Sequence, residues 1–414
     1  MGRYFDYNDS LYDITNRYPE TLDLFITNGF ENMRDERMRK SFGKSISLEM
    51  ALSMKKINID TFVDRMIEII DENKTVVDES LISSNKNTNA DVRIDGVLPC
   101  PVRIPLMDAF NIWMEEKGNK LNISVDYELK AASSGVDWIK HTLEESESED
   151  VLSDIFISAG FDLFFDTRLM GKFKSQGVFE DMTGFENFNS DFDNEYIDLK
   201  DPDRQYSIIG VVPAVFLVNT EELDGRKMPS SWEDILSPEF ENTVSLPIGD
   251  FDLFNSILLN IYKKFGEDGL RRLGKSLLRS MHPSEMVKSY IKKENKPVVT
   301  IMPYFFTKMI KRGGPMVPVW PTDGAIISPI FLLAKKSKKD LVKPFVDFFA
   351  SKEVGEILAH NGRFPSTNPE VDNMISADCE YMWLGWDYIV ENNIGELIAK
   401  CEDIFHKSIL GGIE

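Results

Sequence analysis

Cys100 is the residue of this chain best placed to do chemistry, because a thiol stands there between Pro99 and Pro101. The other two cysteines, Cys379 and Cys401, are far from it in the sequence, and no CxxC pair occurs. This spacing excludes a disulfide framework and a zinc knuckle. A nucleophilic thiol needs a neighbouring base or a lowered pKa, and no histidine is near Cys100 in the sequence. A small buried side chain and a residue beside a ligand are the two other interpretations, and all three stay open.

The charged residues of the chain indicate which classes of partner it can bind. The net charge is −22, and residues 141–203 hold 17 acidic against 4 basic side chains, with the run EESESED at 144–150. Nucleic-acid binding requires a basic stripe, and none is visible, so we expect no nucleic-acid partner. The four histidines are His141, His282, His360 and His406. Their spacing is not that of metal ligands, so the histidines predict no metal site.

The N-terminal sequence has no basic and apolar export segment, and no run of about 18 apolar residues occurs. We therefore expect a cytoplasmic protein with no membrane span.

Elements that could position these residues fall into two parts. Residues 1–75 contain short amphipathic helices, with Asp13 or Thr15 as the first cap and Ser45 or Ser47 as a later one. Residues 76–91 are polar, lack periodicity and indicate a linker. From residue 92 onward strands alternate with helices, which predicts parallel sheets with crossover connections.

In such sheets, ligands gather at the carboxyl ends of the strands. Val92–Leu98 is a predicted strand, and Pro99–Pro101 follows it; a helix then starts with Pro105 as its first residue. A second predicted strand ends at Ser158, Ala159 and Gly160. Both turns are therefore candidate binding segments.

Three segments resemble a known family. They are Pro321–Val371, containing PTDGAIISPIFLLAKK and NGRFPSTNPEV; Ser231–Pro247, SWEDILSPEFENTVSLP; and Gly210–Asn219, GVVPAVFLVN. Together they resemble the class II periplasmic-binding-protein-like solute-binding proteins of ABC transporters, in the ferric iron, phosphonate and polyamine branch. The resemblance implies an α/β fold with two lobes over residues 92–414, approximately 92–210 plus 328–414 and 220–318. We expect a separate sheet in each lobe, with 206–219 and 319–333 crossing between them.

The resemblance also implies a ligand between the lobes, held by turns and helix N-termini. The residues that it points to are Pro99, Cys100, Pro101, Arg103, Ser158, Ala159, Gly160, Asp250, Phe251, Tyr304, Asp323 and Gly324. Arg103 is either a surface ion pair or an anchor for an acidic group. Asp250 and Asp323 are either helix caps or ligand contacts.

Tyr304 aligns with the place where iron binders of the family carry consecutive tyrosines. Phe305 and Phe306 follow it here, which disfavours ferric binding through protein ligands alone. The alternative for Tyr304 is a half-buried aromatic of the core.

The front unit resembles a small all-α domain of unknown function, through Ile14, Tyr18-Pro19-Glu20, Phe25 and Gly29. Many of its members carry a CxxC after that glycine, and this chain has Glu31-Asn32-Met33-Arg34 instead. The redox function therefore does not carry over, and we expect residues 1–75 to dock a protein partner or a second copy.

These observations predict a binding protein for a small polar ligand, anionic or metal-containing, with no catalytic residue, no protein-bound metal and no identified cofactor. One alternative is a cytoplasmic regulatory or cofactor-handling protein. The other is an enzyme on the same fold with Cys100 as nucleophile, as in thiaminase-like proteins.

Overall fold

The chain divides into two compact units, residues 1–85 and 86–414. The computed structural model describes residues 4–18, 21–22, 25, 30, 33, 36–55, 59, 62–63, 66–67, 70, 90–131, 136–192, 197–248, 251–281 and 283–409. Three expected site residues are affected. Asp250 lies outside the described residues, and the side chains of Cys100 and Phe251 do as well.

The first unit is helical, as expected. Its described helices are α1 (Leu11–Arg17), α3 (Glu36–Ser45) and α4 (Leu48–Met54). Ser10 caps α1 by accepting a hydrogen bond from the backbone N–H of Asp13, so the predicted caps Asp13 and Thr15 are wrong by about one turn. Ser47 caps α4 as predicted. The sequence did not predict α3, which is strongly polar, and the unit's buried core includes Leu11, Phe25, Leu48, Phe62 and Met66.

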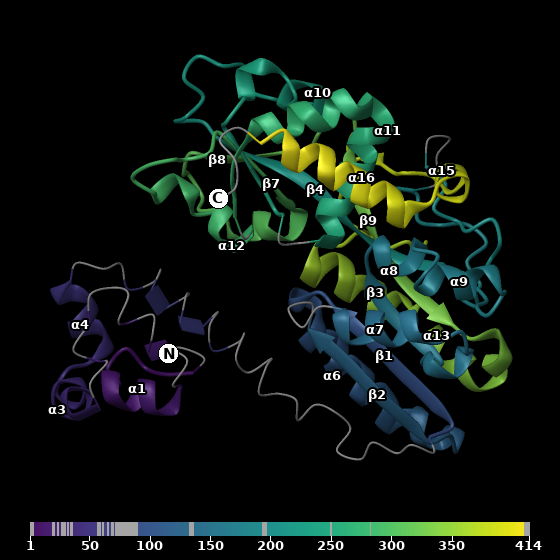
Figure 1. The fold of residues 1–414 in the computed structure, drawn as a ribbon. Helices are drawn as coiled ribbons and strands as arrows, with labels where there is room; N and C mark the ends of the chain where they lie inside the picture. The colour runs from purple at the N-terminus through teal and green to yellow at the C-terminus, as the bar shows by residue number, and fades with distance from the viewer. Residues whose placement is uncertain are drawn as a thin grey trace. The chain divides into compact units, whose positions relative to one another are not determined.

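In the second unit, three parallel strands form one half of the sheet: β1 (Val92–Leu98), β2 (Val125–Ala131) and β3 (Ile155–Ala159). Helices α6 (Cys100–Glu116), α7 (Asp137–Glu145) and α13 (Lys339–Phe349) accompany them (Figure 1). The bounds of β1 are those predicted, because a strand-like run of seven residues closed by a proline turn is a local signal.

The other half has the same pattern in β5 (Val244–Leu246), β6 (Leu277–Ser280) and β7 (Val299–Pro303), again mutually parallel. Helices α10 (Trp232–Ile235), α11 (Phe251–Ser276) and α12 (Pro283–Met286) belong to this half (Figure 1). The C-terminal helix α16 (Ile394–Lys407) lies along α11, and Lys400 forms an ion pair with Glu267 at 3.2 Å.

Two long strands, β4 (Ser207–Asn219) and β9 (Ala325–Ala334), run between the halves. The strand order is β2-β1-β3-β9-β4-β7-β5-β6, with β8 (Met316–Val319) on β4 and β10 (Tyr381–Met382) on β9. The expectation of two separate sheets is therefore wrong. The first half of β4 pairs with β9 and its second half with β7 and β8, because the crossing segment is itself a strand that is long enough to pair on both sides.

Helix α6 begins five residues earlier than predicted. Pro99 is its N-cap and Pro101 occupies its first turn, so Pro105 lies inside the helix and not at its first position. Pro105 removes only the hydrogen bond to the carbonyl of residue 101, close to the helix start, where the loss is tolerated. Helix α11 is kinked at Gly266, which has a φ of +66°.

The two faces of β9 belong to different parts of the core, because successive side chains of a strand point to opposite faces. Ile326, Ile330 and Leu332 join one buried cluster, and Ile327, Phe331 and Leu333 join the other. The strand is thus buried on both sides, as its continuous apolar sequence indicates.

The remaining short elements are α8 (Asp162–Phe165), α9 (Met170–Ser175), α14 (Lys352–Glu356), α15 (Trp386–Glu391), the 3₁₀ segment η9 (Tyr304–Met309) and the π-helical segment η11 (Ile357–Asn361). Within the described ranges, no helix is long and apolar enough to cross a membrane.

Candidate functional site

The turn after β3 meets the first turn of α11. Gly160 has a φ of +140°, and a Cβ added to it would lie 2.7 Å from Oδ1 of Asp252. Only glycine accepts both that backbone angle and that neighbour. Two of the predicted segments, Ser158–Gly160 and the start of α11, therefore do come together.

Within that turn, the Ser158 side chain is buried and its hydroxyl donates to the carbonyl of Ala159 at 3.0 Å. The polar surface that this turn offers is therefore mainly backbone.

The turn after β1 is positioned by α6. Val102 packs against Gly362, where a Cβ would lie 2.5 Å from Cγ1 of Val102. Arg103 is 7% exposed, and its Nε donates to the carbonyl of Leu129 in β2 at 3.0 Å. The surface ion pair is therefore the wrong interpretation of Arg103, and its role as a ligand anchor stays a prediction that this geometry does not favour.

Tyr304 follows β7 directly and is half-buried. The guanidinium carbon of Arg363 lies over its ring at 5.1 Å from the centroid, and the ring of Trp320 meets it edge-on at 5.3 Å. Arg363 also donates to the hydroxyl of Thr307. Such a cation over an aromatic face is electrostatically favourable.

Lys308 adds hydrogen bonds between η9 and the segment that carries Arg363. Its Nζ donates to the carbonyls of His360 at 2.6 Å and Asn361 at 2.9 Å. Burial, followed by the nearby Arg363 guanidinium, lowers the pKa of Lys308 below its usual value. Segment 360–364 thus packs against η9 on one side and, through Gly362, against α6 on the other, which links the turns after β1 and β7.

Asp323 and Gly324 form hydrogen bonds and an ion pair with helices α10 and α11. The Asp323 carboxylate accepts from the backbone N–H of Trp232 at 3.0 Å and forms an ion pair with Lys264 at 2.8 Å. The Gly324 carbonyl accepts from Nε1 of Trp232 at 3.0 Å. Asp323 therefore binds the first N–H of α10, whose N-cap is Ser231, and a ligand role for Asp323 or Gly324 stays a prediction.

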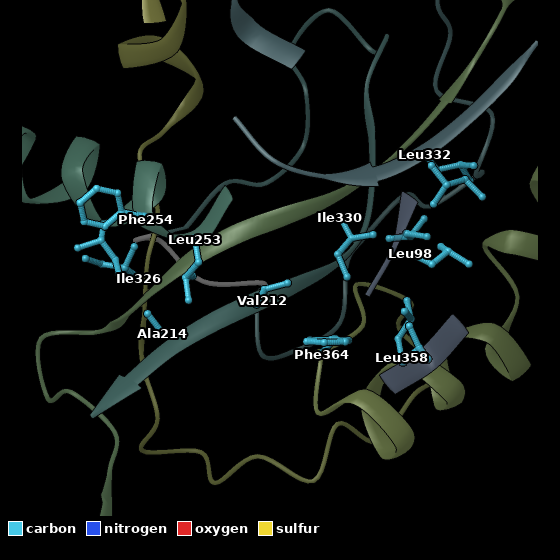
Figure 2. Close-up of a cluster of buried hydrophobic side chains, with 14 of the residues drawn as sticks. Leu98, Val212, Ala214, Leu253, Phe254, Ile326, Ile330, Leu332, Leu358 and Phe364 are labelled. Atoms are coloured by element: carbon cyan, nitrogen blue, oxygen red, sulfur yellow. The ribbon is translucent and has the colours of Figure 1, made fainter. Parts of the chain in front are cut away.

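A cluster of buried apolar side chains spans the crossing strands. Figure 2 shows Leu253, Val212, Ile330 and Leu98 following one another, from α11 across β4 and β9 to β1. Ser328 lies between Ile326 and Ile330 on the same face of β9 and opposite Val212 in the register. Its hydroxyl is buried and has no hydrogen-bond partner among the described residues.

A cavity of about 530 Å³ lies elsewhere in this unit and is lined by Gly184–Asn187, Ser351, Lys352 and Asn368–Glu370. None of the predicted site residues lines it, and it is open and shallow. We therefore do not take it as the ligand site.

Within the described part of the chain, no cluster of three or more His, Cys, Asp or Glu side chains could hold a metal ion.

Sequence reasoning missed four residues that the fold brings to these turns: Asp252, Lys308, Ser328 and Arg363. Ser328 had a signal, because it is a hydroxyl in a ten-residue apolar strand. Arg363 had a weaker one, because it precedes Phe364-Pro365 in a segment already singled out.

Comparison with family models gives two matches. A model for bacterial extracellular solute-binding proteins matches residues 150–392, and a model for a domain of unknown function matches residues 5–63.

Among individual proteins, the chain is 22% identical over 308 residues to the spermidine/putrescine-binding periplasmic protein of Salmonella typhimurium, covering 66% of this chain and 84% of that protein. Among solved structures, the apo ferric ion-binding protein A of Pasteurella haemolytica has a TM-score of 0.54 at 11% identity, covering 76% of this chain and 97% of that one. The periplasmic binding protein AfuA of Actinobacillus pleuropneumoniae, with fructose-6-phosphate bound, has a TM-score of 0.51 at 16% identity, covering 76% and 98%. These likenesses confirm the two-lobed binding-protein fold.

Proposed function

Because this chain belongs to the bacterial extracellular solute-binding protein family, we propose that it holds a small polar ligand, anionic or metal-containing, in a cleft between its lobes. Residues 92–210 with 328–414 form one proposed lobe, and residues 220–318 form the other. The family match supports the binding of a ligand in a cleft, whereas the chemistry of the ligand is argued from this chain's own residues.

The observation that carries the proposal is the meeting of Gly160 with the first turn of α11. Gly160 follows a strand of one proposed lobe, and α11 follows β5 of the other. In α/β sheets, ligands bind outside the carboxyl ends of strands, where backbone N–H groups and helix N-termini are available. The first turn of α11 and the turn after β3 supply both.

The three relatives do not settle the ligand, since they are named for or were solved with a polyamine, a ferric ion and a sugar phosphate. Leu98, Val212 and Ile330 are buried in the core at the crossing strands, and we propose the Ser328 hydroxyl beside them as a polar contact for the ligand. A buried hydroxyl without a partner costs free energy until a ligand or water satisfies it. A metal would enter as part of a complex, because the described residues offer no metal-ligand cluster of their own.

We propose that binding closes the two lobes by a hinge motion in β4 and β9, with no chemical step. The names of the relatives describe binding and not catalysis, which supports this view. A protein partner for residues 1–75 is a separate proposal, for which the helical unit supplies the candidate surface.

The proposal is tested by native mass spectrometry of the purified protein, followed by hydrogen exchange with and without the retained molecule. We expect an added small mass that unfolding and refolding remove. Restoring it should slow amide exchange at 158–163, 251–256 and 304–309. Protection confined to the cavity at Gly184–Asn187 and Asn368–Glu370, or to residues 1–85, would contradict the cleft.

A further inference from the structure

Two cations come together at η9 without an acidic partner. Arg363 contacts Tyr304 and Thr307, and Lys308 contacts two backbone carbonyls. Among the described residues, no carboxylate lies within ion-pair distance of either, and the one charged neighbour that shifts the pKa of Lys308 is Arg363 itself. The net charge of the chain is −22, and other cations such as Lys264 and Lys400 do form ion pairs.

Both side chains are held in place but keep unused donors. The guanidinium of Arg363 has five N–H donors, and one of them donates to the hydroxyl of Thr307. The ammonium of Lys308 has three N–H donors, and two of them donate to backbone carbonyls. The backbone of Arg363 has a φ of +49°, a conformation that costs free energy for a residue other than glycine and that often marks a functional position.

The position of the pair matters as much as its charge. Lys308 is carried by η9, after β7, whereas Arg363 is carried by the segment that packs on α6. An anion bound by both would therefore connect the two proposed lobes. It would also relieve the repulsion between the two like charges.

We propose that Arg363 and Lys308 bind the acidic group of the ligand, a carboxylate or a phosphate, beside Tyr304. This assignment rests on the proposed function, because it places the anion within the same cleft. A planar guanidinium fork suits two oxygens of either group, and the ammonium adds a point charge. The same pair repels a polyamine, so the ligand differs in charge from that of the Salmonella relative.

The experiment titrates the full chain with inorganic phosphate, citrate and spermidine, with tryptophan fluorescence as the readout; Trp320 lies beside Tyr304. We expect phosphate or citrate to bind at up to millimolar concentrations and spermidine not to bind. The comparison of phosphate with citrate distinguishes a phosphate ligand from a carboxylate one.

Arg363→Gln should weaken binding of the anion by about tenfold or more, since it removes hydrogen bonds to a charged group. Lys308→Gln should weaken it by about threefold to tenfold, and Arg363→Lys should fall between wild type and Arg363→Gln. The matched control is Lys311→Gln, an exposed lysine on the same segment, which changes net charge equally and should alter affinity by less than about twofold. Circular dichroism verifies folding, and if Arg363→Gln is unfolded, Lys308→Gln carries the test.

Response to spermidine, response to none of the three probes, or equal effects of Lys308→Gln and Lys311→Gln would each overturn the assignment. A cationic or uncharged molecule that co-purifies and protects 158–163 and 251–256 would also overturn it, while leaving the proposed cleft intact.

Discussion

Replacing Gly160 with alanine tests the geometry on which the proposed cleft depends. The added Cβ would lie 2.7 Å from Oδ1 of Asp252, against an ordinary contact distance of 3.4–4 Å. The carboxylate, or the turn of α11 that carries it, must then retreat by about 0.7 Å. The backbone at φ +140° adds strain of its own, because alanine rarely adopts that angle.

The expected magnitude has two parts. The backbone conformation costs roughly 1–3 kcal/mol and the overpacking against Asp252 a further 1–3 kcal/mol, so we expect the free energy of unfolding to fall by about 2–6 kcal/mol. Gly177→Ala is the matched control, because Gly177 also has a positive φ, +72°, but nothing within 4 Å of its added Cβ. It should cost only about 1–2 kcal/mol.

Urea unfolding followed by tryptophan fluorescence measures this difference in the second unit alone, because all six tryptophans lie between residues 113 and 386. Introducing Gly160→Ala into an Asp252→Ala background completes a double-mutant cycle. Removal of the carboxylate should recover about 1–2 kcal/mol of the loss. Equal costs for Gly160→Ala and Gly177→Ala, with no recovery in the cycle, would refute the close approach of β3 to α11.

Three other predictions concern single side chains. Burial raises the pKa of Asp95 to about 6 from an ordinary 3.8, so the folded state is destabilised above about pH 6 and this penalty disappears as the pH falls toward 3.8. Asp95→Asn should therefore raise the free energy of unfolding by up to about 3 kcal/mol at pH 7.5 and by less than about 1 kcal/mol at pH 4. Urea unfolding at the two pH values measures this difference, and a gain that is the same at both would contradict the assignment. Tyr304 is followed by Phe305 and has the Arg363 guanidinium over its ring. Ferric salts should therefore give no intense charge-transfer band in the visible absorption spectrum. A strong band that is lost in Tyr304→Phe would prove this prediction wrong. Trp232→Phe removes a fully buried indole and its hydrogen bond to the Gly324 carbonyl. Urea unfolding should therefore show that the free energy of unfolding falls by about 2–4 kcal/mol, against about 1 kcal/mol for the half-buried control Trp113→Phe. Similar losses in the two variants would mean that the hydrogen bond contributes little.

Local signals in the sequence predicted many of the elements. β1 has the predicted bounds because seven apolar-rich residues end at a proline turn. Ser231 begins α10 with a full capping box to Asp234, at the start of a segment that the sequence had singled out. Gly266 interrupts α11 where the helical pattern breaks. Each of these depends on residues within a few positions of one another, where backbone preference and side-chain hydrogen bonds decide the outcome.

The family resemblance added the two-lobed fold and the turns at strand ends, and the match over residues 150–392 agrees with it. It did not specify what each side chain does. Arg103 donates to the carbonyl of Leu129, and Asp323 accepts from the backbone N–H of Trp232. These partners are 26 and 91 residues away in the sequence, so no local pattern predicts them.

The bounds of β1, the turns that follow β1 and β3, and the acidic composition of the chain could all be read from the sequence. Only the tertiary structure decided that β4 pairs on both sides of the molecule, that Gly160 touches α11 and that Arg363 meets Lys308 at η9. The physical reason is distance along the chain. Periodicity and capping act within one or two turns, whereas these contacts join residues more than 50 positions apart and exist only because the packed sheet and helices hold them together.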